Sequence, residues 1–168
     1  MHRGLYRYVL GVDPDIEKSG FALLDVEKRT FVSVNSFRFP EAVSFLSTID
    51  KESLLVVIED SSGTTHNWHV TNKDSKAVSA LKGHNVGLCH ATARHLLQMA
   101  EEYGLKAMSV FPLRKIWGKD GGEKISHKEL SDFVSDMPKR TNQEERDAML
   151  LAWSHAELPI FVKPKPYK

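Results

Sequence analysis

Cysteine is almost absent from this sequence, in which Cys89 is the single thiol among 168 residues. With one cysteine no internal disulfide can form, and we expect the chain to reside in a reducing compartment. Long apolar runs are missing as well, so we expect neither a signal peptide nor a membrane span. The charge is nearly balanced, with a formal net charge of +1 and a pI near 7.9. A polyanionic partner would therefore have to be bound by a local basic patch.

The residues that are present suit one globular domain. A chain of 168 residues, 41% hydrophobic and 27% charged, is long enough to bury a substantial core. No internal repeat or domain boundary interrupts it, so residues 1–168 are expected to form a single domain. Residues 158–168 are basic and interrupted by proline, and we expect this tail to be irregular.

The stretch around which the chain can be arranged reads YVLGVDPDIEKSGFALLD. One apolar run ends at Asp13 and a second begins at Gly20, which predicts a strand, a turn and another strand. Residues 30–39 alternate and are rich in aromatic and β-branched side chains, which predicts a third strand and an antiparallel meander. An aspartate at the end of a buried strand costs stability unless it is solvated, paired or bound to a cation.

The remaining chain alternates between helices and strands. We expect helices over about 40–50, 86–103, 126–136 and 142–157, an apolar strand over 53–60, and a short strand that begins at 106. Residues 61–85 are polar and predict no regular element. Helical crossovers favour parallel pairing. The predicted fold is therefore α/β, a mixed five-stranded sheet with an antiparallel meander, then parallel strands, and helices on both faces.

Carboxylates occur in three distant segments that can meet. Asp13 ends the first strand, Glu59 ends the central apolar strand, and the last helix carries Glu144 and Asp147 on one face. Parallel neighbouring strands would bring the first two to the same edge of the sheet, where α/β folds place their sites. Side chains alternate along a strand, so Glu59 and Asp60 point to opposite faces. We choose Glu59 because it follows the apolar run directly.

Carboxylates held a few Å apart repel one another, and a divalent cation removes that repulsion. Hard oxygen ligands without cysteine or histidine at the same place indicate Mg²⁺ or Mn²⁺ rather than Zn²⁺. Two such ions can activate a water molecule and stabilise the leaving oxygen of a phosphodiester. The candidate catalytic and metal-binding carboxylates are Asp13, Glu59, Glu144 and Asp147.

Three of these carboxylates also have a purely structural interpretation. Asp13 precedes a proline and can start a turn. Glu59 can pair with a lysine at the strand end, and Asp147 can be a solvated first-turn acid that the helix dipole favours.

Glu144 has two alternative roles. It can close a capping box with Thr141, in which case it does not face a metal. Asn142 can cap the helix equally well with Glu145 as its partner, which would leave Glu144 free to act as a ligand.

The chain resembles the RuvC-type Holliday junction resolvases, a branch of the ribonuclease H-like superfamily. The matching segments are GVDP followed by SGFA, VVIED, NVGLCHATARHLLQMAEEYGL, GGEKISHKEL and EERDAMLLAW, in the family's order over most of the chain. The resemblance implies an RNase H-like fold and metal-dependent cleavage of branched DNA, with two Mg²⁺ or Mn²⁺ ions per site. It also implies a homodimer that presents two active sites to a four-way junction. For such a protein we expect a cytoplasmic, nucleoid-associated location.

Carried over by position, the family's acidic ligands fall on Asp13, Glu59, Glu144 and Asp147. Its lysine inside the penultimate helix corresponds to Lys128, a further catalytic residue, and an upstream lysine to Lys115 or Lys119. The chain departs from the family at Asp15, where glycine is usual, and at Glu144, where aspartate is usual. The segment after the second ligand is also longer or differently arranged.

DNA contacts are expected from a basic, glycine-rich loop and from one aromatic residue. The loop has the composition of a phosphate-binding arm, although Asp120 and Glu123 dilute its charge and a plain solvated loop is the alternative. The aromatic residue can stack on bases or pack on its own domain. Histidines at 66, 69, 84 and 90 match no structural zinc pattern. The candidate DNA-binding residues are Trp68, Arg114, Lys115, Lys119 and Lys124.

Two other functions compete with this interpretation. A junction-binding or nucleic-acid-binding protein of the same fold, with little or no nuclease activity, is the alternative if Glu144 serves as a helix cap. An actin-like ATPase shares the acidic first-strand turn. The chain is too short for two such domains, however, and it lacks a second phosphate-binding glycine loop.

Overall fold

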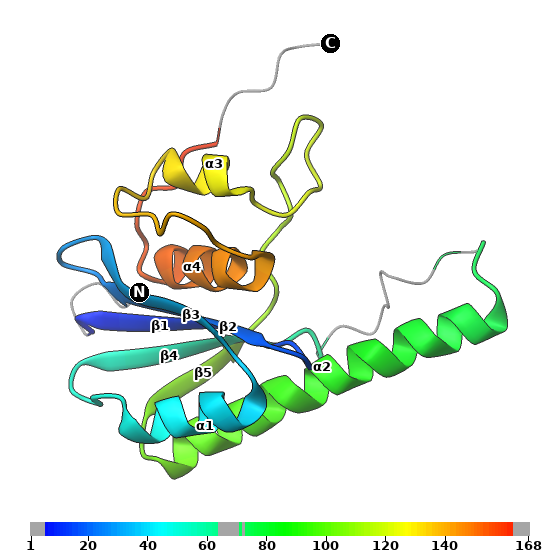
Figure 1. The fold of residues 1–168 in the computed structure, drawn as a ribbon, viewed down its shortest axis with the longest axis horizontal. Coiled ribbons are helices and arrows are strands. Elements are labelled where there is room, and N and C mark those ends of the chain that lie inside the picture. Colours follow the sequence, from blue (N-terminus) through cyan, green and yellow to red (C-terminus); the bar gives the residue numbers. More distant parts are fainter. Residues whose placement is uncertain (1–5, 64–70, 72, 163–168) are drawn as a thin grey trace.

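The central sheet has five strands, which the computed structural model places at β1 Tyr8–Asp13, β2 Ser19–Asp25, β3 Thr30–Phe37, β4 Leu54–Glu59 and β5 Lys106–Val110. The structure describes residues 6–63, 71 and 73–162. The spatial order is β3-β2-β1-β4-β5. The first three strands pair antiparallel, and β1, β4 and β5 pair parallel. The predicted mixed sheet is therefore confirmed (Figure 1).

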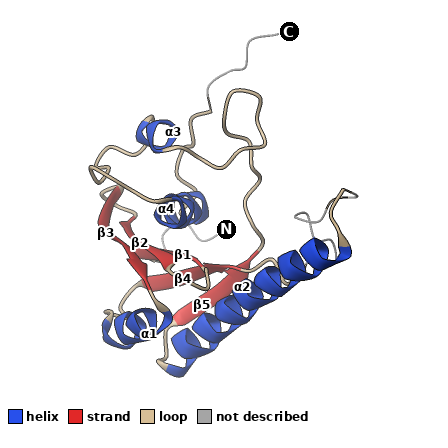
Figure 2. Ribbon diagram, turned by 45° about the vertical axis from the view of Figure 1, so that its right-hand side comes forward, coloured by secondary structure: helices blue, strands red, loops and turns tan. Residues whose placement is uncertain are grey.

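Helices cover both faces of this sheet. Within the described residues they are α1 Phe39–Thr48, α2 Lys76–Glu102, α3 His127–Ser131 and α4 Gln143–His155. Figure 2 shows α4 against one face and α1 and α2 against the other, with α3 beyond α4. Among the described residues, none of the helices combines the length and the apolar composition of a membrane span.

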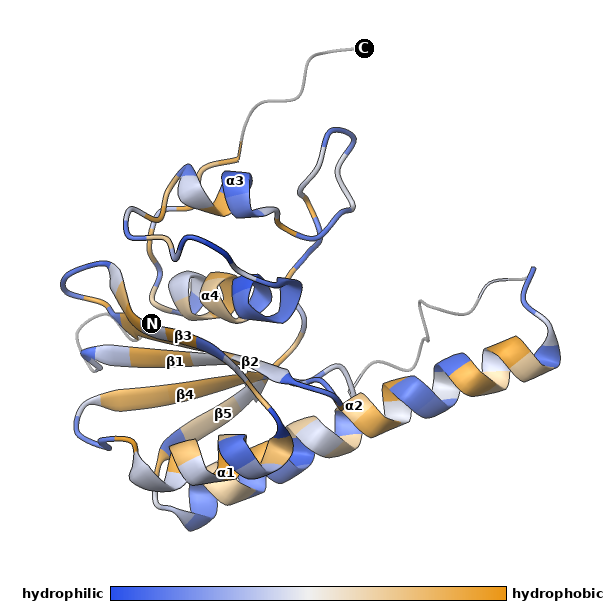
Figure 3. Ribbon diagram, in the orientation of Figure 1, coloured by the Kyte–Doolittle hydropathy of each residue, from blue (hydrophilic) through white to orange (hydrophobic). Residues whose placement is uncertain are grey.

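Strand β4 is apolar along nearly its whole length, as Figure 3 shows. The reason is that its alternating side chains pack into two different cores. Leu55 and Val57 pack into the core beneath α4. Leu54, Val56 and Ile58 pack into the core beneath α1 and α2. A strand covered on both faces needs apolar residues at every position, because neither face is solvated.

The strand register brings the ends of β1 and β4 together. Val12 pairs with Ile58 across the parallel ladder, so the next residues, Asp13 and Glu59, end neighbouring strands at the same edge. Asp13 also pairs with Gly20 of β2. The carboxyl end of the parallel strands is thus the edge at which the predicted ligands emerge.

Two glycines allow α4 to lie directly on the sheet. A Cβ atom added to Gly11 would overlap the carbonyl oxygen of Ala148 and lie 2.8 Å from the amide nitrogen of Ala152. One added to Gly20 would overlap the carbonyl of Glu144. All of these atoms are backbone, so no side-chain rotation could relieve the overlap. The close approach therefore requires glycine on the sheet side, where the backbone of α4 takes the place of a side chain.

The long helix α2 differs from the prediction, since it begins at Lys76 rather than near residue 86. The side chain of Ser75 caps it by accepting a hydrogen bond from the amide of Val78, and Lys82 pairs with Asp74 at 2.8 Å. The buried residues of α2 all lie in its second half, at Thr92, Ala93, Leu96 and Ala100. The first half projects beyond the sheet (Figure 1), and its apolar side chains Val78 and Leu81 are exposed, so it forms no buried stripe.

The observed bounds of the other helices lie closer to the predicted ones, except for the end of α3. The predicted helix 126–136 shortens to α3, which is capped by Ser126 and ends at Ser131. The chain continues beyond Asp132 in tighter turns, because the amide of Phe133 bonds to the carbonyl of Leu130. The predicted helix 142–157 is α4, with Asn142 as its N-cap.

Gly11→Ala is expected to lower the free energy of unfolding by about 1–3 kcal/mol or more, because the new methyl group would force α4 away from β1. Urea titration of the purified variant measures the change. Gly87→Ala is the matched control, since no atom other than the neighbouring backbone of α2 lies within 4 Å of the position that its new methyl group would take. It should stabilise the protein by about 0.5–1 kcal/mol. A Gly11→Ala midpoint equal to that of the wild type would contradict the close contact.

Candidate active site

Asp13 is the buried centre of the site, with a side chain at the end of β1 and a relative exposure of 9%. Burial raises the pKa of its carboxyl well above the usual value, and the negative charges of Glu59, Asp147 and Glu144 raise the pKa further. The positive charge of Lys124 opposes this shift. Carboxylates from β1, β4 and α4 are therefore close enough to affect one another's ionisation.

Glu59 occupies the neighbouring strand end and is half-buried. Burial raises the pKa of its carboxyl, and so does the charge of Asp147, whereas Lys124 and Lys115 lower it. The adjacent Asp60 instead accepts hydrogen bonds from the amide and hydroxyl of Ser62, at 2.8 and 3.0 Å, in the local turn. The structure thus brings Glu59 toward the other carboxylates and uses Asp60 to close a turn.

The start of α4 decides between the two alternative caps. The side chain of Asn142 accepts a hydrogen bond from the amide of Glu145 at 2.8 Å, and the Glu145 carboxylate accepts one from the amide of Asn142 at 2.9 Å. This capping box leaves the side chain of Glu144 out of the cap. Its backbone lies against Gly20, and its charge contributes to the raised pKa of Asp13.

Asp147 is paired with a lysine from the glycine-rich loop. The ammonium of Lys124 lies 2.5 Å from Oδ2 of Asp147, and their side chains are 45% and 16% exposed. Burial would lower the pKa of Lys124, but its hydrogen bond to Asp147 and the charges of Asp147, Asp13 and Glu144 raise it. Lys124, which the sequence suggested as a DNA contact, therefore lies among the carboxylates as their neighbouring cation.

The other predicted cations lie at different distances from this cluster. Lys115 is exposed, and its charge acts on Glu59. Arg114 and Lys119 are exposed in the loop between β5 and α3, where Gly118, Gly121 and Gly122 have positive φ angles. Lys128, the predicted catalytic lysine, is exposed on α3. No ion pair or hydrogen bond within the described residues joins its ammonium to the carboxylates.

Trp68, the predicted base-stacking residue, lies outside the described residues.

The turn between β1 and β2 accommodates the unusual Asp15. Its carboxylate accepts a hydrogen bond from the amide of Glu17 at 2.8 Å, and its amide donates to the hydroxyl of Ser19 at 3.1 Å. Aspartate thus closes this turn through its own side chain, as Asx turns do. Cys89 of α2 lies near this turn, and burial followed by the charge of Asp15 raises the pKa of its thiol.

The oxygen donors of the four carboxylates are of the chemical type that a hard divalent cation prefers. Mg²⁺ and Mn²⁺ take carboxylate oxygens, which all four acidic side chains provide. As the side chains stand, no three His, Cys, Asp or Glu residues of the described chain form a group that could hold a metal ion. The carboxylates are electrostatic neighbours without forming a closed coordination sphere, an arrangement consistent with mutual repulsion and with the ammonium at Asp147.

The sequence did not single out two polar side chains that reach this site or its supporting helix. The Gln143 amide donates to Oδ1 of Asp147 at 2.8 Å. The Ser36 hydroxyl of β3 donates to Glu145 and accepts a hydrogen bond from Asn142. Gln143 could have been found from its spacing of four residues before Asp147, which places both on one helix face. Ser36 carries no comparable signal, because it is far from α4 in sequence.

Comparison with known proteins identifies the class of fold. No protein-family model matches the chain, and no curated protein matches it. A Thermus thermophilus RuvC structure is similar over 89% of this chain and 93% of its own, with 15% identity and a TM-score of 0.56. T. thermophilus RuvC in complex with a Holliday junction substrate is similar over 90% and 93%, with 13% identity and a TM-score of 0.55. The chain therefore has a RuvC-like, RNase H-like fold.

Asp13→Asn is expected to raise the thermal midpoint of the metal-free protein at pH 7. Because the folded-state pKa of Asp13 is raised, the folded protein binds more protons than the unfolded chain between the two pKa values. The associated stability is present below the unfolded pKa and is lost as the pH rises through the folded pKa. Asparagine cannot ionise, so the variant does not lose this stability as the pH rises. Each kcal/mol of folding free energy that it keeps raises the thermal midpoint by about 2–4 °C.

Calorimetric scans of wild type and Asp13→Asn between pH 4 and pH 8 in a chelator measure this effect. The difference should shrink toward pH 4, where the wild-type carboxyl is protonated. Asp60→Asn, outside the cluster, is the control and should give no gain. An Asp13→Asn midpoint at or below the wild-type value at pH 7 would contradict the electrostatic coupling.

Proposed function

We propose that this protein is a metal-dependent endonuclease that cleaves branched DNA and resolves Holliday junctions by phosphodiester hydrolysis. The observation that carries the proposal is the electrostatic effect on Asp13, at the carboxyl edge of the parallel strands, of carboxylates from β4 and α4. Burial and neighbouring negative charge raise the pKa of Asp13 and of Glu59 there. Such clusters of perturbed carboxylates are typical of functional sites.

The residues that would hold Mg²⁺ or Mn²⁺ are Asp13, Glu59, Glu144 and Asp147. Two bound ions would activate a water molecule and stabilise the leaving oxygen of the phosphodiester. The chain itself supplies the orientation, because α4 fixes its two carboxylates against the strand ends through Gly11 and Gly20. Burial of Asp13 keeps bulk water from screening the charges around it.

We assign to Lys124 the role that the family resemblance gave to Lys128. The Lys124 ammonium contacts Asp147, and its side chain is 45% exposed, so it can turn toward a phosphate oxygen beside the carboxylates. A cation at that place would stabilise the negative charge that develops on the phosphate in the transition state. Lys115, whose charge acts on Glu59, is the second lysine of the proposed site.

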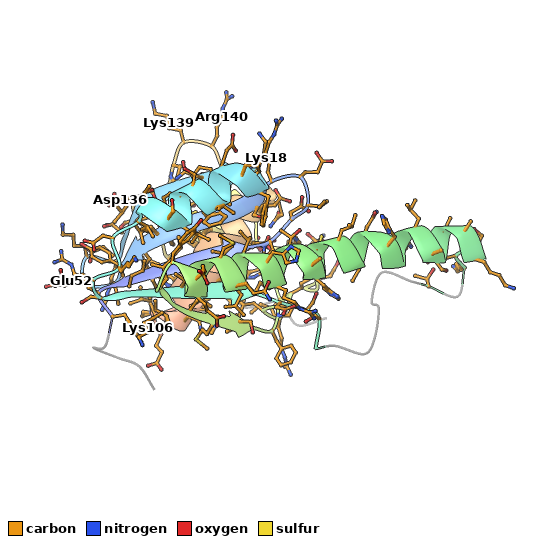
Figure 4. All side chains as sticks on the ribbon, turned by 90° about the horizontal axis from the view of Figure 1, so that it is seen from below. Lys18, Glu52, Lys106, Asp136, Lys139 and Arg140 are labelled. Carbon is orange, nitrogen blue, oxygen red and sulfur yellow. The ribbon has the colours of Figure 1, made fainter. Side chains whose placement is uncertain are left out.

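Branched DNA would be bound by the cations around this edge. Arg114, Lys115 and Lys119 are exposed in the glycine-rich loop and can contact phosphates, and we retain Trp68 as a candidate for base stacking. Figure 4 shows Lys18, Lys139 and Arg140 extending outward on one side of the molecule. These three belong to the segments that precede β2 and α4, so they are further candidates. We propose that a homodimer presents two such sites to one four-way junction.

The alternative of a binding protein without nuclease activity depended on Glu144 as a helix cap. Glu145 takes that place in the structure, since its carboxylate accepts the hydrogen bond from the amide of Asn142. Glu144 is therefore not needed as a helix cap, and the argument for a binding protein without nuclease activity loses its structural support.

Incubation of the protein with a synthetic four-way junction and a matched duplex, with and without Mn²⁺, tests the proposal. We expect paired, symmetric nicks in the junction, only with metal, and none in the duplex. Lys124→Ala should reduce the cleavage rate about 100- to 1000-fold, the range for loss of one transition-state donor.

Lys128→Ala is the matched control and should cleave within about threefold of the wild type, since Lys128 is exposed and no ion pair or hydrogen bond of the described residues joins its ammonium to the carboxylates. Equal losses in both variants would contradict the assignment of Lys124. A protein that binds the junction and never nicks it in Mg²⁺ or Mn²⁺ would favour the binding-protein alternative.

A further inference from the structure

A hydrogen-bond network beneath the carboxylates centres on the guanidinium of Arg146. Its Nε donates to the carbonyl of Ile125 at 3.1 Å, its Nη1 to the carbonyl of Thr141 at 2.6 Å, and its Nη2 to Oε1 of Gln143 at 2.8 Å. The guanidinium is planar, stays charged and has no acceptor. It therefore joins the loop before α3, the approach to α4 and the first turn of α4 in one rigid arrangement.

This arrangement determines which way the amide of Gln143 faces. Arginine can only donate, so the atom of Gln143 that faces Nη2 must be the carbonyl oxygen. The NH₂ group of Gln143 consequently points the other way, toward Oδ1 of Asp147 at 2.8 Å and toward the carbonyl of Ile125 at 3.3 Å. An amide orientation that is otherwise ambiguous is thus fixed by the chemistry of its neighbour.

The two oxygens of Asp147 have donors of different kinds. Oδ1 receives the neutral amide of Gln143, which lies one helical turn earlier, and Oδ2 receives the ammonium of Lys124. The lysine is long, flexible and 45% exposed, so it can leave when another cation or a phosphate arrives. Gln143 is half-buried and held by Arg146, so it stays. A neutral donor orients the carboxylate without cancelling the charge that a metal ion needs.

We propose that Gln143 and Arg146 are positioning residues, in which Arg146 fixes the amide of Gln143 and Gln143 in turn fixes the direction in which the Asp147 carboxylate faces a divalent cation. The same guanidinium holds Ile125 and thereby keeps Lys124 beside the cluster. The assignment rests on the proposed function, because it requires a cation at Asp147. Removal of a residue that orients a metal ligand through a hydrogen bond commonly weakens metal binding about 10- to 100-fold.

Calorimetric titration of the protein with Mn²⁺ alone, without DNA, tests the assignment. Gln143→Met removes the amide at similar size, and Arg146→Lys keeps the positive charge but loses the fork. Each should weaken Mn²⁺ binding at least about 10-fold. The double variant should lose less affinity than the two single losses added together, because Arg146 acts on Asp147 in part through Gln143.

Ser36→Ala is the matched control, since Ser36 bonds to Asn142 and Glu145 at the same end of α4 without reaching Asp147. It should lower the thermal midpoint and leave the Kd for Mn²⁺ unchanged. Thermal scans of every variant show which are folded, and Arg146→Lys decides the question if Gln143→Met does not fold.

Three results would overturn the assignment. Wild-type Mn²⁺ affinity in Gln143→Met or Arg146→Lys would show that the network does not orient Asp147. An equal loss of affinity in Ser36→Ala would show that the network merely stabilises the helix end. A wild-type protein that binds no Mn²⁺ would overturn the proposed function together with this assignment, whereas the first two results leave the proposed function intact.

Discussion

The contact between α4 and the sheet is the constraint on which the site depends. A helix normally packs on a sheet through side chains, but here its backbone meets β1 and β2 at Gly11 and Gly20, where a Cβ atom would overlap it. This approach places the first turn of α4 beside the end of β1. Side chains in place of these glycines would push the first turn of α4, which carries Glu144 and Asp147, away from the sheet.

Bringing these carboxylates together costs stability in the absence of a cation. Burial and like charge raise the pKa of Asp13 and Glu59, which means that the ionised form is disfavoured in the folded protein. Lys124 offsets part of the repulsion through its ion pair with Asp147. The fold thus holds mutually repelling negative charges at the sheet edge, the feature from which we propose a metal-binding site. The rest of the structure, from the two-faced core around β4 to the capping box of α4, keeps that cluster in place.

Much of this organisation could be predicted from the sequence, because the signals are local. Strand alternation and the apolar run of β4 predicted the sheet. Carboxylates after two strands and on one helix face indicated the acids whose charges act on Asp13 in the structure. The start of α2 was missed because no residue of its first half is fully buried, and the apolar side chains of Val78 and Leu81 there are exposed. The position of Lys124 beside Asp147 could not be read from the chain, since it depends on how a glycine-rich loop folds back over α4. The network around Arg146 was missed for the same reason, because one of its partners is a backbone carbonyl of that loop.

Cleavage and binding of a four-way junction by Asp13→Asn, measured in Mn²⁺ beside the wild type, test the central claim most directly. Asparagine keeps the size of the side chain and removes the charge at the buried centre of the cluster. The account predicts that the variant binds the junction with wild-type affinity and makes no detectable cut under conditions in which the wild type cuts both strands. A metal-dependent Asp13→Asn enzyme that cuts at the wild-type rate would contradict it.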